Sequence, residues 1–189
     1  MHFSNFCSII AFARTSSSVD RAMASGAMCA GSIPVWCIIF IFGGKMHYYI
    51  YCKENSISKY QQDAISEYTK RLSPYCDIHF IIDTKCTIPH NFSTSNHQVL
   101  YIDRSISTYS SISFAKHIED IESGGKSNLH IYIGYTLNEM YEAYNNFENI
   151  TYDVMSITNT NISNITLSIL LYEQIYRGYT IIQGKTYHK

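Results

Sequence analysis

Short runs of aromatic and β-branched residues alternate with helical patterns along the whole chain after residue 46. The runs predict five strands, at 47–52, 77–82, 99–103, 129–133 and 152–157. Between them apolar residues recur at three- and four-residue steps, which predicts helices over 60–72, 111–123, 138–146 and 165–176. This alternation predicts an α/β fold, in which a largely parallel sheet has helices on both faces.

A fold of this class also predicts where a ligand binds. In open α/β sheets, ligands bind outside the carboxyl ends of the strands, where the connecting loops begin. Those positions follow the third, fourth and fifth predicted strands, at 102–105, 134–137 and 156–163.

The composition changes abruptly near residue 45. All 17 tyrosines lie after this point, whereas six of the nine alanines lie before it. The segment Ser16–Trp36 reads SSSVDRAMASGAMCAGSIPVW and resembles the conceptual translation of a transfer-RNA gene. We therefore expect Met46 to be the true initiator, with residues 46–189 as the folded domain and residues 1–45 not made. The alternative is a genuine but disordered leader with an apolar patch at Trp36–Phe42.

Several classes of protein are disfavoured by the sequence. The longest apolar stretch, Ile33–Phe42, contains Pro34 and is far shorter than the roughly 18 residues that span a membrane. The six cysteines include no C-x-x-C pair, which argues against a zinc site. We expect no membrane span, no metal, and reduced, buried thiols of the kind found in cytoplasmic proteins.

Three segments carry a family resemblance. They are SKYQQDAISEYTKRLSPY (58–75), YSSISFAKHI (109–118) and EQIYRGYTIIQGKTYHK (173–189). From Met46 to the last residue the chain resembles the RlmH family, the 23S rRNA pseudouridine N3-methyltransferases of the SPOUT class. The resemblance implies a C-terminal trefoil knot, a cytoplasmic homodimer, S-adenosyl-L-methionine bound in the knot loops, and 23S rRNA in the ribosome as substrate.

The resemblance also implies which residues form the site. By position, the cofactor loops of the family fall on Ile102, Gly134, Met155, Ser156, Ile157, Thr158, Asn159 and Thr160. The nucleophile is an imide nitrogen that must lose a proton, so a base and an anion stabiliser are useful. Tyr187 and His188 of the C-terminal tail could supply them, while Arg177 or Lys189 meets the RNA phosphate.

The sequence departs from the family pattern at four places. Tyr135 replaces a second glycine after Gly134, and 104–107 lacks a Gly-Lys pair. The family's Pro-His falls on 163–164, and an arginine of the following helix falls on Ser168. We expect Tyr135 to restrict the backbone and to add bulk where the main chain approaches the ligand. The alternative function is therefore a catalytically degenerate paralogue, a dimer that binds RNA or the ribosome without methyl transfer.

The charge of the domain adds a second reason to keep this alternative. Residues 46–189 carry 11 Lys and Arg against 14 Asp and Glu, whereas RNA-binding domains usually show a basic face. A local basic patch could still form from Lys70, Arg71, Arg177, Lys185 and Lys189.

Overall fold

The computed structural model describes residues 44–147, 150 and 152–185 of the chain. Within these residues, strands and helices alternate as the sequence predicts. In chain order they are β1 (Met46–Cys52), α4 (Lys59–Leu72), β2 (Cys76–Ile82), β3 (His97–Ile102), α5 (Ser111–Ser123), β4 (Asn128–Ile133), α6 (Leu137–Tyr144), β5 (Tyr152–Met155) and α7 (Asn164–Ile182).

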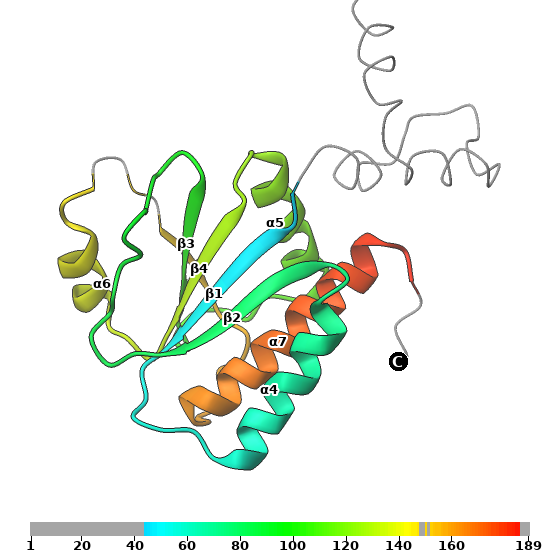
Figure 1. Cartoon of the computed structure of the whole chain (residues 1–189), viewed down its shortest axis with the longest axis horizontal. Helices are drawn as coiled ribbons and strands as arrows, with labels where there is room; N and C mark the ends of the chain where they lie inside the picture. The colour runs from blue at the N-terminus through cyan, green and yellow to red at the C-terminus, as the bar shows by residue number, and fades with distance from the viewer. Residues whose placement is uncertain (1–43, 148–149, 151, 186–189) are drawn as a thin grey trace, which may run out of the picture. The chain divides into compact units, whose positions relative to one another are not determined.

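The five strands form one sheet in the order β2-β1-β4-β3-β5, and every pairing is parallel. Helices α4, α5 and α7 cover one face, and the short α6 lies on the other (Figure 1). The predicted α/β class, with helices on both faces, is confirmed. Because all strands run the same way, their carboxyl ends share one edge of the sheet.

Each face of the sheet has its own core, because successive side chains of a strand point to opposite sides. In β4, Leu129, Ile131 and Ile133 pack toward α7, whereas Tyr132 packs toward α6. The core on the α7 side is mainly aliphatic. The core on the α6 side is rich in tyrosine, and its buried members include Tyr51, Tyr101, Tyr132, Tyr135 and Tyr144.

All four described helices begin at a hydroxyl side chain that accepts a hydrogen bond from a backbone N–H of the first turn, as strong N-caps do. These N-caps are Ser58, Ser110, Thr136 and Ser163. The predicted end of the second helix at 123 is also confirmed: Gly124 caps α5, and Gly125 adopts φ +79°, which L side chains disfavour.

Two predicted boundaries are wrong at the carboxyl end of the domain. The fifth strand ends at Met155 rather than 157, and Ser156 keeps a single bridge to Thr108. The last helix runs from Asn164 to Ile182 rather than over 165–176. It continues through Gly178 because α5 packs there: a Cβ on Gly178 would lie 3.1 Å from Cδ1 of Ile118.

No described helix is long and apolar enough to cross a membrane. The three cysteines of the described part, Cys52, Cys76 and Cys86, are free and buried. Burial raises the pKa of the Cys52 thiol to about 11 and that of Cys86 to about 12, so both remain protonated near neutral pH.

Candidate functional site

The carboxyl ends of β3, β4 and β5 lie side by side at one edge of the sheet. Ile102 pairs with Ile133 on one side and with Met155 on the other. The backbone N–H of Asp103 donates to the carbonyl oxygen of Met155 at 2.8 Å. The fold therefore brings together the three predicted cofactor loops, which follow Ile102, Ile133 and Met155.

Gly134 occupies the centre of this edge and has φ +84°. A Cβ there would lie 2.4 Å from Nδ2 and 2.7 Å from Cγ of Asn164, the first residue of α7. The position thus requires glycine for two reasons: its backbone is left-handed, and the start of α7 leaves no space for a methyl group.

The side-chain amide of Asn164 ties the loops together. Its Nδ2 donates to the carbonyl oxygen of Lys53, the residue after β1, at 3.1 Å. Its Oδ1 accepts a hydrogen bond of 2.9 Å from the guanidinium of Arg104, in the loop after β3. One amide therefore joins the loops after β1 and β3 to the turn at Gly134, and we call these four residues the amide junction.

The loop after β5 is held by its own polar groups. The wholly buried Ser156 accepts a hydrogen bond from the backbone N–H of Tyr109 on its carbonyl oxygen, at 2.9 Å. The hydroxyl of Thr158 donates to that of Thr160 at 3.0 Å and accepts from the Thr160 backbone N–H at 3.1 Å. Ile157 is half-buried beside them, and Asn159 is exposed.

At this edge Glu139 has a cationic partner, whereas Asp103 accepts hydrogen bonds from the neutral groups of Ser105. The ammonium of Lys53 lies 2.5 Å from a carboxylate oxygen of Glu139 in α6. This hydrogen bond and those from Thr136 lower the pKa of Glu139 to about 2, so the pair is ionic at neutral pH. The Asp103 carboxylate accepts from the backbone N–H and the hydroxyl of Ser105, both at 2.8 Å.

The structure gives Tyr135 an ordinary backbone conformation and a buried side chain. Among the described non-glycine residues only Cys86 has a positive φ, so the tyrosine imposes no backbone strain. Its side chain, 3% exposed, is buried in the core on the α6 side. There its hydroxyl donates to the carbonyl oxygen of Asp83. The ring therefore packs away from the Gly134–Asn164 contact.

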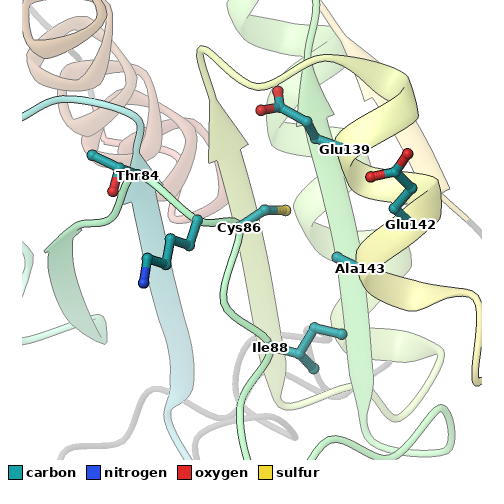
Figure 2. A pocket seen from close by; sticks show the side chains of 7 residues that line it. Thr84, Cys86, Ile88, Glu139, Glu142 and Ala143 are labelled. Atoms are coloured by element: carbon teal, nitrogen blue, oxygen red, sulfur yellow. The ribbon is translucent and has the colours of Figure 1, made fainter.

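A cavity of about 540 Å³ lies on the α6 side (Figure 2). It is lined from the loop between β2 and β3, where the Cys86 side chain is directed toward α6, and from α6, which contributes Glu139 and Glu142. None of the predicted cofactor residues lines it.

Of the predicted catalytic residues, only Arg177 belongs to the described part of the chain. Arg177 is 13 residues along α7 from Asn164, which at the helical rise is about 20 Å. Its guanidinium donates to the hydroxyl of Ser111 at 3.4 Å. Tyr187 and His188 lie outside the described residues, as does Lys189. Arg177 is thus not brought to the amide junction of its own chain.

Ser168, where the family's arginine falls, is completely buried one turn into α7. Its hydroxyl donates to the carbonyl oxygen of Asn164 at 2.9 Å.

The sequence analysis gave no role to Lys53. A cation directly after a buried central strand is a signal that could have identified it as part of this edge. Within the described residues, no three His, Cys, Asp or Glu side chains gather to hold a metal ion.

Comparison with known proteins agrees with this architecture. The family model described as predicted SPOUT methyltransferase matches residues 46–188. The chain belongs to the SPOUT methyltransferase family. The predicted resemblance is therefore confirmed, while the trefoil knot stays a prediction.

Curated members of the SPOUT family are similar over nearly their whole length. Ribosomal RNA large subunit methyltransferase H 1 of Thermoanaerobacter sp. (strain X514) is 32% identical over 147 residues, which cover 76% of this chain and all of the relative. Ribosomal RNA large subunit methyltransferase H of Clostridium tetani is 31% identical, with 69% of this chain and 92% of the relative covered. The protein of that name from Clostridium novyi is 30% identical, with 76% and 100% covered.

Proposed function

We propose that this protein is an S-adenosyl-L-methionine-dependent methyltransferase that methylates N3 of a pseudouridine in 23S rRNA of the large ribosomal subunit. The observation that carries the proposal is the amide junction: three loops at the carboxyl edge are fixed against one another around Gly134. The names of the similar curated proteins support the substrate. The burial of Tyr135 in the core on the α6 side also supports the proposal, because its ring does not fill the Gly134–Asn164 contact.

The residues at the edge fit the proposed cofactor. Ile102, Gly134 and 155–160 offer backbone amides and carbonyls together with the hydroxyls of Thr158 and Thr160. Such groups suit the adenine and ribose of a nucleoside. When bound, the cofactor supplies a methyl group on a sulfonium, and its transfer is an in-line displacement. Fixed loops favour this reaction because positioning supplies much of the rate.

The C-terminal tail is proposed to complete the site. His188 takes the proton from the imide nitrogen and Tyr187 stabilises the developing anion, while Arg177 or Lys189 contacts the RNA phosphate. Because α7 carries Arg177 about 20 Å from Asn164 of the same chain, we propose a homodimer in which the second chain's tail serves each site. The protein would act in the cytoplasm, on ribosomes.

A methyl-transfer assay tests the proposal. Large ribosomal subunits from cells that lack the gene are incubated with the protein and S-adenosylmethionine labelled in its methyl group. We expect label in 23S rRNA, and at least a hundredfold slower incorporation by His188→Ala with unchanged cofactor affinity. Cofactor binding without incorporation by the wild-type protein would favour the degenerate paralogue. Absence of cofactor binding would overturn the proposed methyltransferase and would also favour the degenerate paralogue.

A further inference from the structure

Arg104 is the cation that projects into the amide junction. It follows β3 by two residues, is half-buried, and donates from one guanidinium nitrogen to Oδ1 of Asn164 at 2.9 Å. Since Asn164 also abuts Gly134, this hydrogen bond holds the guanidinium where the loop after β3 meets the turn after β4 and the start of α7. The sequence pattern places this residue at the carboxyl edge of the sheet but indicates no partner for its side chain.

The charge of Arg104 has no counterion in the described part of the chain. Two carboxylates at this edge have other partners: Glu139 pairs with Lys53, and Asp103 accepts from Ser105. No described carboxylate lies within 4.0 Å of the Arg104 guanidinium. A half-buried cation without a partner costs free energy, and an anionic ligand at this point would offset the cost.

We propose that Arg104 binds the α-carboxylate of the cofactor's methionyl group; this inference rests on the proposed function. The planar guanidinium presents paired N–H donors that match a carboxylate in two parallel hydrogen bonds. Asn164 takes one of the two N–H bonds of Nη2, and the second N–H of Nη2 remains to form a fork with a neighbouring guanidinium nitrogen. An RNA phosphate is the less favoured anion, because the guanidinium is turned into the loop junction and held there by a half-buried amide.

Two ligands that differ only in the carboxylate test this proposal. S-adenosylmethionine and decarboxylated S-adenosylmethionine are titrated calorimetrically into the full-length protein, into Arg104→Gln and into Arg104→Lys. Lys116→Gln, which removes one positive charge from the exposed surface of α5, is the control. We expect Arg104→Gln to weaken S-adenosylmethionine at least tenfold and to leave the decarboxylated ligand within twofold of wild type. Arg104→Lys, which keeps the charge but not the fork, should give an intermediate loss.

The other outcomes distinguish a structural role of Arg104, a contact of Arg104 with RNA, and a failure of the proposed function. Equal weakening of both ligands in Arg104→Gln and Arg104→Lys would assign Arg104 a purely structural role and overturn the proposal. Unchanged affinity for both ligands, with a raised KM for ribosomes, would identify an RNA contact and also overturn it. In either case the proposed methyltransferase survives. Failure of the wild-type protein to bind S-adenosylmethionine would overturn the proposed function, and this inference with it.

Discussion

The structure allows the loss of stability caused by Gly134→Ala to be worked out from three separate contributions. The left-handed backbone, φ +84°, costs an L residue about 1 kcal/mol. The new methyl group would also displace the Asn164 amide, which lies 2.4 Å from the Cβ position, and break its hydrogen bonds to Lys53 and Arg104. At about 1 kcal/mol for each bond, the total loss of stability is about 3 kcal/mol.

Gly125→Ala is the matched control for this substitution. Gly125 has nearly the same backbone conformation, φ +79°, but a Cβ there meets no atom within 4 Å. We expect it to cost about 1 kcal/mol, from the backbone alone. Denaturant unfolding of both variants measures the difference.

The double variant Gly134→Ala/Asn164→Ala isolates the contact itself. Asn164→Ala loses the same two hydrogen bonds as Gly134→Ala, so the double variant loses them once. It should be about 2 kcal/mol more stable than the sum of the single losses. Equal costs for Gly134→Ala and Gly125→Ala, or simple additivity in the double variant, would refute the reasoning about the amide junction.

Three further predictions concern the two cores. Burial and the neighbouring His97 lower the pKa of His130 to about 3, so the folded state disfavours its protonation. Stability should therefore fall as pH drops below 6.5, by about 1.4 kcal/mol per pH unit, and His130→Phe should flatten this slope in unfolding measured from pH 7 to 5. Tyr135→Phe loses one hydrogen bond and should cost about 1 kcal/mol in denaturant unfolding, with cofactor affinity within twofold; a tenfold change would mean that the ring lines the site. Ser168→Arg, which restores the family's residue, should destabilise by more than about 4 kcal/mol because the position is completely buried, whereas Ser168→Ala should cost about 1 in the same assay.

The sequence predicted the edge of the sheet but not how its loops are joined. Strand periodicity and the rule for parallel sheets placed 102–105, 134–137 and 156–163 at one edge, and the pairing of β3 with β4 and β5 confirms it. The hydrogen bond between Arg104 and Asn164 spans 60 residues. Periodicity carries no information about such a contact, because it depends on the tertiary approach of a loop to the start of α7.

The sequence also does not specify which core the Tyr135 ring joins. Leu129, Ile131 and Ile133 face α7, so simple alternation would turn residue 135 toward α7 as well. The left-handed backbone at Gly134 breaks this alternation and sends the Tyr135 ring to the α6 side. A single dihedral angle thus decided which core the ring joins, and a sequence pattern does not specify it.

Amide chemical shifts measured by NMR during titration with S-adenosylmethionine test most directly whether the cofactor binds at the carboxyl edge of the sheet. We predict that the largest changes lie at Ile102, Arg104, Gly134 and 156–160, and that the indirectly coupled Lys53 also responds. Changes confined to α6 and the 84–88 loop, around the cavity of Figure 2, would contradict the placement of the cofactor. A spectrum unaltered at millimolar ligand would contradict the existence of a cofactor site in this fold.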